Sequence, residues 1–304
     1  MAAERTQYSA PELLAEARER VDVLLAAWAE RIGTIVPGRT GEALAYALNT
    51  PGKRVRAALV LAAYRSVGGI SPAIAAVAAA VETVHTYSLV HDDLPCMDDD
   101  DLRRGRPTTH RAYDVPTATR VGFLLVPVAG LVLAQAARDL VLPPDALGRM
   151  AGEVFEAGGI EGMVGGQWLD LEAEGRALDL EGLMAVHRGK TGALIRAACV
   201  LGGMAGEAPP PALEALRRYG QEVGLAFQIA DDVLDVTATS AQLGKTAGRD
   251  AALAKSTYVS LMGVDRARAE AEALSQRAIG HLEQAGLDAG ALGALAEYIV
   301  RRES

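Results

Sequence analysis

Aspartates are concentrated in two short stretches of this sequence. The first stretch, residues 91–110, reads HDDLPCMDDDDLRRGRPTTH, so six aspartates fall within ten positions and arginines follow at once. The second stretch, residues 227–236, reads FQIADDVLDV. Crowded carboxylates repel one another, and burying them is costly unless they are paired or coordinate a metal. Each stretch therefore needs either a solvated loop or a bound cation to offset its charge.

The second stretch has the spacing of a helix. One helix face would carry four polar residues at positions i, i+3, i+4 and i+7, namely Gln228, Asp231, Asp232 and Asp235. Apolar residues occupy the positions between them, which indicates a largely buried helix. A solvated polar face on a half-buried helix is the alternative interpretation of this stretch by itself.

The first stretch follows a helical pattern that should end near Pro95, because proline disfavours helix in the residue before it. Asp92 and Asp93 would then lie at a helix C-terminus, where the macrodipole disfavours each negative charge by about 0.3–1 kcal/mol. After the turn, Asp98 can approach Asp92. This placement predicts a compensating cation, whereas the next three aspartates are interpreted as a solvated loop: Asp99, Asp100 and Asp101.

Carboxylate oxygens select hard divalent cations such as Mg²⁺, Ca²⁺ or Mn²⁺. The spacing of a calcium EF-hand loop is absent from both stretches. Mg²⁺ usually takes one or two carboxylates together with phosphate oxygens, so we expect a phosphorylated substrate between the stretches. Phosphate contacts could come from ten basic residues: Lys53, Arg54, Arg56, Arg103, Arg104, Arg106, Lys190, Lys245, Arg249 and Lys255. None of the lysines stands in a P-loop frame, which disfavours a nucleotide.

Helical periodicity runs through nearly all of the 304 residues and is interrupted by breaks rich in glycine and proline. Half of the residues are hydrophobic and only 4% are aromatic, with many alanines and leucines, which favour helix. No linker or internal repeat divides the chain. We therefore expect an all-α fold, a single domain over residues 1–304 built as a bundle of roughly ten helices.

Charge and composition indicate which binding partners and which cellular compartment to expect. The net charge of −9 disfavours a nucleic-acid partner. The two cysteines lack a paired or metal-binding spacing and the first residues lack a signal-peptide pattern, so we expect a cytoplasmic protein. Residues 121–137 carry no charge, but they are fewer than the roughly 20 that a membrane span needs. We expect a buried core helix there and no transmembrane segment.

Five motifs resemble, in their order along the chain, those of the trans-isoprenyl diphosphate synthases, above all the bacterial farnesyl and geranylgeranyl diphosphate synthases. The motifs are GKRVR at 52–56, HTYSLVHDDLPCMDDDDLRRGRPTTH at 85–110, GKTGALI at 189–195, FQIADDVLD at 227–235, and LGKTAGRD with KSTY at 243–258. The resemblance implies an all-α fold around a central cavity, usually in a homodimer. It also implies Mg²⁺-dependent head-to-tail condensation of isopentenyl diphosphate with an allylic diphosphate, dimethylallyl or geranyl.

The resemblance also implies roles for the residues that match these motifs. About three Mg²⁺ ions would be held by Asp92, Asp98, Asp231 and Asp235, with support from Asp93 and Asp232. Arg103 would contact the allylic diphosphate. The isopentenyl diphosphate site would comprise Lys53, Arg56, His85 and Arg104. Groups lining the reacting carbons would be Lys190, Thr191 and Gln228, and further diphosphate contacts would be Lys245 and Lys255.

Product length in this family depends on the residues four and five positions before the first aspartate, which here are Ser88 and Tyr87. Helical rise over five residues places Tyr87 about 7.5 Å from the metal ligands. A tyrosine there should stop the chain at C15, which gives farnesyl diphosphate. A C20 product, geranylgeranyl diphosphate, is the alternative.

The chain departs from the family's usual pattern at three places. Phe123 stands where the family usually has the aspartate of a Gly-Asp pair, and Ala57 and Ala230 replace residues of other types. Two rival functions are less favoured. A class I terpene cyclase would need an aromatic-rich pocket, and the chain has only three phenylalanines and two tryptophans. A non-catalytic regulatory subunit would usually lack one aspartate motif, and both are present.

Overall fold

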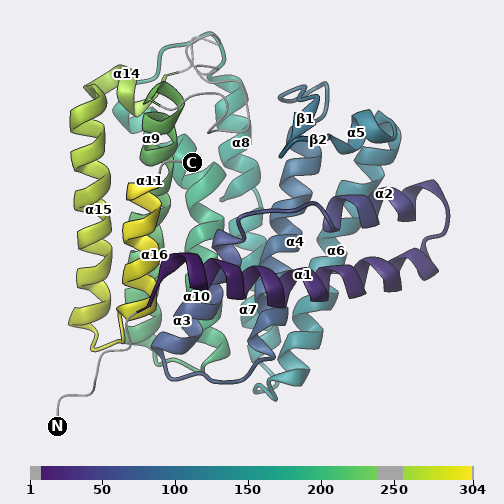
Figure 1. Ribbon diagram of the computed structural model, residues 1–304, viewed down its shortest axis with the longest axis horizontal. Coiled ribbons are helices and arrows are strands. Elements are labelled where there is room, and N and C mark those ends of the chain that lie inside the picture. The colour runs from purple at the N-terminus through teal and green to yellow at the C-terminus, as the bar shows by residue number, and fades with distance from the viewer. Residues whose placement is uncertain (1–7, 238–255, 303–304) are drawn as a thin grey trace.

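The structure is a computed structural model, and it describes residues 8–237 and 256–302 (Figure 1). Its first helices are α1 Ala10–Ile35, α2 Arg39–Leu48, α3 Val55–Ser66, α4 Ile74–Asp92, α5 Thr109–Ala112, α6 Val115–Asp139, α7 Ala146–Gly158 and α8 Met163–Glu172. The others are α9 Leu180–His187, the π-helix η1 Arg188–Gly192, α10 Ala193–Ala205, α11 Pro210–Thr237, α14 Tyr258–Met262, α15 Val264–Gln284 and α16 Gly290–Arg301. The all-α prediction is confirmed, with more helices than the roughly ten expected.

Three helices, α3, α4 and α10, form the centre of the molecule. Residues 57–63 of α3 are almost entirely buried, and the first half of α4 is buried on all sides. Helices that are apolar all round belong in a protein interior. α10 packs against α3 and α11, while α1 crosses the front of the bundle in Figure 1. This packing fixes α4 and α11, the two helices that carry the acidic stretches.

α6 contains the uncharged stretch of the sequence. It is the one helix in the described part of the chain that is long and apolar enough to cross a membrane, and half of its apolar window is buried in the protein. A single such helix is weak evidence for a span, because core helices share these properties. α6 packs along α4 on one side and exposes Phe123 and Leu131 on another. The expected burial is therefore found on only part of the helix.

A short hairpin follows the first acidic stretch. β1 Leu102–Arg103 pairs antiparallel with β2 Arg106–Pro107. The turn between them holds Arg104 and Gly105 at φ values of 55° and 75°, as a two-residue hairpin with a matching twist requires. Figure 1 shows the hairpin at the same end of the bundle as α8, α9 and α14. Strands this short leave no alternation in the sequence, which is why they were not expected.

Candidate active site

The first acidic stretch folds back on itself as the sequence predicted. α4 ends at Asp92, and the backbone N–H of Asp98 donates a hydrogen bond of 2.8 Å to the carbonyl oxygen of Asp92. The N–H of Asp99 donates to the carbonyl of Leu94 at 3.1 Å, and Asp99 adopts a left-handed φ of 47°. The turn thus brings two predicted metal ligands, Asp92 and Asp98, together at the end of a helix.

Asp92 is in an unfavourable environment for a carboxylate. Its burial is the largest effect and, together with the neighbouring Asp98 carboxylate, raises the pKa of Asp92 to about 7, although Lys190 acts in the opposite direction. Its side chain has no hydrogen bond or ion pair with another described residue. The nearby Lys190 and Arg103 charges therefore offset an ionised Asp92 only in part, and a bound cation would offset the rest.

Asp93 has a different task from Asp92. Its side chain is buried and accepts a hydrogen bond of 2.7 Å from Nε of Arg103, and Asp100 binds Nη2 of the same guanidinium at 2.9 Å. The solvated-loop interpretation is therefore wrong for Asp100, because the hairpin turns Arg103 back onto it. Asp99 and Asp101 do have exposed side chains, paired with Arg111.

The loop before α3 presents the predicted isopentenyl diphosphate cations. Arg54 takes a left-handed φ of 54° and points inward, where its guanidinium donates to Asp22 at 2.7 Å and to Glu82 at 3.2 Å. Glu82 also accepts the backbone N–H of Ala57 at 3.1 Å. Arg54, a candidate phosphate contact in the sequence, is therefore buried in ion pairs. Its neighbour Lys53 is exposed.

The four residues predicted for this site lie close together. Nη1 of Arg56 lies 3.3 Å from Nε2 of His85, and Nη1 of Arg104 donates to the carbonyl of Pro51 at 2.8 Å. Burial lowers the pKa of His85 well below its usual value, and the Arg56 and Arg104 guanidinium groups lower it further. His85 is therefore a neutral imidazole among cations. Gly52 is required for this arrangement, because a Cβ there would lie 2.4 Å from the Arg104 guanidinium.

The second acidic stretch lies on α11, and its three aspartates have different surroundings. Asp231 forms an ion pair with Arg302. Asp232 is buried and accepts the backbone N–H of Tyr258 at 2.8 Å and the Gln228 amide at 3.2 Å. Asp235 is buried as well, and its Oδ1 has no hydrogen-bond partner in the part of the chain that the structure describes. The predicted helix and its shared polar face are confirmed.

Arg302 belongs to the site although no sequence motif indicated it. It follows α16, and its side chain is only 3% exposed. The guanidinium stacks on the ring of Phe227 at 4.0 Å and pairs with Asp231. Partial desolvation of its ammonium group lowers the pKa of Lys53 even though much of the side chain is exposed, and the Arg302 charge lowers it further, while Asp231 acts in the opposite direction. Arg302 thus lies between a predicted phosphate contact and a predicted metal ligand.

The residues predicted to line the reacting carbons come from η1 and α11. Oγ1 of Thr191 donates a hydrogen bond of 3.1 Å to Oε1 of Gln228. Nε2 of the same amide donates to Asp232. Nζ of Lys190 binds Asp170 of α8 at 2.6 Å. Burial lowers the pKa of Lys190, but the Asp170, Asp98 and Asp92 carboxylates outweigh it and raise the pKa. Short π-helical segments such as η1 are often found at functional sites.

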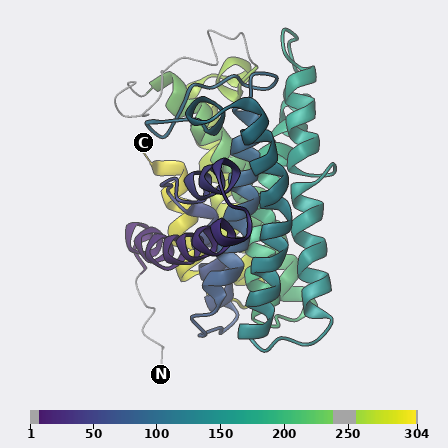
Figure 2. The same ribbon diagram turned by 90° about the vertical axis from the view of Figure 1, so that its right-hand side faces the viewer.

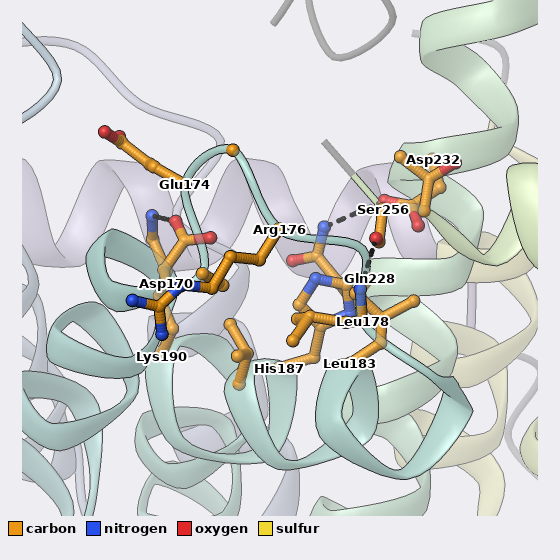
Figure 3. A pocket seen from close by; sticks show the side chains of 14 residues that line it. Asp170, Glu174, Arg176, Leu178, Leu183, His187, Lys190, Gln228, Asp232 and Ser256 are labelled. Carbon is orange, nitrogen blue, oxygen red and sulfur yellow. Dashed lines mark hydrogen bonds and ion pairs between the residues drawn. The ribbon is translucent and has the colours of Figure 1, made fainter. Parts of the chain in front are cut away.

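A cavity of about 140 Å³ opens beside these groups (Figure 3). Figure 3 shows Lys190 with Asp170 on one side of it and Gln228 with Asp232 on the other. Asp170 and Ser256 were not predicted. Asp170 is the last residue of a glycine-rich segment, residues 156–170. Close packing explains that segment at Gly166, where a Cβ would lie 1.9 Å from the backbone nitrogen of Lys190.

Four predicted residues remain, of which two lie on α4. Tyr87 is half-buried and Ser88 is buried, with the Ser88 hydroxyl bound to the carbonyl of His85 at 2.9 Å. Lys245 and Lys255 lie outside the described residues.

The donor set suits Mg²⁺ better than a metal held by protein alone. Within residues 8–237 and 256–302, no group of three or more His, Cys, Asp or Glu side chains could hold a metal ion. Mg²⁺ commonly takes only one or two carboxylates and completes its shell with phosphate oxygens and waters. Two features fit that mode of binding. The charge of Asp92 is only partly offset by nearby cations, and Oδ1 of Asp235 has no hydrogen-bond partner among the described residues.

Comparisons with known proteins identify the family of this chain. The family described as polyprenyl synthetase matches residues 38–289. The chain is 45% identical over 265 residues to a farnesyl diphosphate synthase of Escherichia coli (strain K12), covering 86% of this chain and 88% of that protein. It is 40% identical over 296 residues to a dimethylallyltranstransferase of Fischerella ambigua (strain UTEX 1903), covering 97% and 84%.

Solved structures show the same fold. An FPP/GFPP synthase from Zymomonas mobilis superposes with a TM-score of 0.83 at 35% identity, covering 95% of this chain and 98% of that one. A geranylgeranyl pyrophosphate synthetase from Pyrococcus horikoshii Ot3 gives a TM-score of 0.83 at 32% identity, covering 96% and 99%.

Proposed function

The chain belongs to the polyprenyl synthetase family as a short-chain prenyltransferase, and we propose that it makes mainly farnesyl diphosphate. The reaction would condense isopentenyl diphosphate with dimethylallyl or geranyl diphosphate. One observation carries the proposed prenyl transfer: each acidic stretch lies beside a different set of basic side chains, and these sets would bind the two diphosphates. The charges of Lys190 and Arg103 act on Asp92, and the charge of Asp231 acts on Lys53.

Mg²⁺ would be the cofactor, with about three ions as the count implied by the resemblance. The ligands would be Asp92, Asp98, Asp231 and Asp235. When bound, the metal supplies charge stabilisation for the departing diphosphate. The carboxylates of this chain would hold it between the end of α4 and the last turns of α11, and Asp93, which accepts a hydrogen bond from Arg103, would keep that arginine aimed at the same diphosphate.

The remaining residues would bind and orient the substrates. Lys53, Arg56 and Arg104 would hold the isopentenyl diphosphate, with neutral His85 as a further contact. Thr191 and Gln228 would present oxygen dipoles to the cation that develops on the allylic carbon, with Lys190 beside them. Proton loss would go to the departing diphosphate. Further phosphate contacts are proposed for residues outside the described ranges, Lys245 and Lys255.

Product length would be limited by Tyr87, with the smaller Ser88 beside it. The relatives include both farnesyl and geranylgeranyl diphosphate synthases, so membership of the family leaves C15 and C20 open. A bulky ring about 7.5 Å along the helix from the metal ligands supports C15. C20 is the second candidate.

We also propose a homodimer. Exposed apolar side chains on α6, α7 and α8 and in the turn between α7 and α8 support it, and Figure 2 shows these teal helices gathered along one side of the molecule. The side chains are Phe123, Leu131, Phe155, Ile160 and Trp168. Clusters of this kind usually mark interfaces. Light scattering after gel filtration should give twice the chain mass of 31.7 kDa, and a monomer would contradict the proposal. A single domain and a cytoplasmic location remain proposals as well.

The decisive experiment is chromatographic chain-length analysis of the products. The purified protein would be given each of the C5, C10 and C15 allylic diphosphates with isopentenyl diphosphate, with and without Mg²⁺. We expect C15 from the C5 and C10 starters and no product without the metal. Dominant C20 would overturn the role of Tyr87. A cyclic hydrocarbon formed without isopentenyl diphosphate, or activity only with a partner protein, would favour the rival functions.

A further inference from the structure

Three rings form a continuous row between α4 and α6. The ring centroids of Tyr87 and His91 are 5.1 Å apart with an interplanar angle of 69°. Those of His91 and Phe123 are 5.6 Å apart with an angle of 89°. Both contacts are edge-to-face, the arrangement that the charge distribution of aromatic rings favours. The row links a half-buried tyrosine to a phenylalanine that is 68% exposed.

The middle ring is held in place by the backbone of α6. Nε2 of His91 lies 3.2 Å from the carbonyl oxygen of Thr119, which can only accept, so Nε2 carries the proton and donates. Gly122 makes room for the imidazole, because a Cβ there would lie 1.8 Å from Nε2. The His91 ring therefore has one orientation, and any other residue at position 122 would displace it.

Tyr87 depends on this row for its own orientation. Its hydroxyl forms no hydrogen bond with any other described residue, so ring contacts and packing are what select its rotamer. An edge-to-face pair contributes about 0.5–1.5 kcal/mol beyond the burial of its area, enough to favour one rotamer over another. Phe123 lies on the outer side of His91 and stops that ring from moving away from Tyr87.

We propose that His91 and Phe123 are specificity-determining residues, which hold Tyr87 across the path of the growing chain. This inference rests on the proposed role of Tyr87 in product length. It also gives a purpose to the Gly122–Phe123 pair: the glycine admits the imidazole and the phenylalanine supports it from outside. Product length is then set by three rings that act as a unit.

The test is the ratio of C20 to C15 product made from geranyl diphosphate with excess isopentenyl diphosphate. Phe123→Ala should raise this ratio about fivefold, because the tyrosine can then leave its position for part of the time. Leu131→Ala is the matched control: Leu131 is also an exposed apolar residue on α6, at 56% exposure, but lies two turns away. It should leave the ratio unchanged. A wild-type ratio for Phe123→Ala would overturn the inference.

A double variant separates this inference from the function on which it rests. Tyr87→Ala should raise the ratio more than Phe123→Ala, and the double variant should match Tyr87→Ala, because Phe123 acts only through the tyrosine. Independent, multiplying effects would overturn the inference. A shift for Tyr87→Ala without one for Phe123→Ala would overturn the ring row alone. A wild-type ratio for Tyr87→Ala would overturn the proposed role of Tyr87 and the inference with it.

Discussion

The two acidic stretches have similar sequences but different structures. The first begins in the last two residues of α4 and continues through a turn, so its aspartates are positioned by loop hydrogen bonds. The second lies within α11, where helical spacing positions the aspartates. A loop can reach outward to a ligand, whereas a buried helix face is fixed before the ligand arrives.

The second aspartate of each pair shows what the stretches share. Asp93 binds Arg103, and Asp232 binds Gln228 and the start of α14 at Tyr258. Both are buried, and both position another residue of the site. The leading aspartates differ: the charge of Asp92 is only partly offset by nearby cations, but Asp231 is paired directly with Arg302. Metal binding should therefore relieve an unfavourable charge at the first stretch and compete with an arginine at the second.

The largest effect is expected from the leading aspartates. Asp92→Ala and Asp231→Ala should each lower kcat about 10³-fold, because each removes a ligand that would hold Mg²⁺ on the diphosphate. Turnover of geranyl diphosphate with isopentenyl diphosphate at saturating Mg²⁺ measures this loss. Asp99→Ala, at an exposed position of the same stretch, is the control. Near-normal turnover in either variant would refute the assignment of a metal clamp.

A smaller effect, on substrate binding, is expected at Asp93. Asp93→Asn should raise KM for the allylic diphosphate about tenfold, because the ion pair with Arg103 is replaced by a weaker hydrogen bond to a neutral amide oxygen. KM for isopentenyl diphosphate should be unchanged. Asp101→Asn removes a comparable but exposed pair in the same loop and should have no effect. An equal rise in both KM values would show that Asp93 supports the whole loop.

Asp232→Asn should act on turnover instead. A neutral amide offers one oxygen, which cannot accept from both the Gln228 amide and the Tyr258 N–H, so the Gln228–Thr191 contact loosens. We expect kcat to fall about fivefold with little change in either KM. Glu222→Gln on the same helix serves as the control. If KM changed and kcat did not, the two second aspartates would have the same function and the comparison would fail.

The smallest effect is expected at Arg302. Arg302→Ala should lower the Mg²⁺ concentration for half-maximal binding about two- to threefold, because Asp231 is then free for the metal and half-exposed pairs are weak. Calorimetric titration of the substrate-free protein with Mg²⁺ measures this directly. The control is Arg301→Ala, since Arg301 is exposed and its ion pair among the described residues is with Glu297, one turn away. A weaker Mg²⁺ affinity would mean that Arg302 helps to build the metal site.

The sequence alone determined much of the site. Helical spacing placed Gln228 and Asp232 on one face of a helix, and their hydrogen bond is local, four residues apart. A proline after the first aspartate pair located the end of α4. The motif order led to the family, which the comparisons then established. These features depend on neighbours along the chain, and neighbours can be read in a sequence.

Tertiary structure decided which partner each charged group has. Asp232 meets Tyr258 across 26 residues, Asp231 meets Arg302 across 71, and Phe123 reaches His91 from another helix. No periodicity encodes these pairs, because they depend on how whole helices pack. The same cause made Asp100 look like a solvated loop residue and left Arg302 unnoticed. The sequence specified which side chains could perform the chemistry, and helix packing determined which of them hold one another in position.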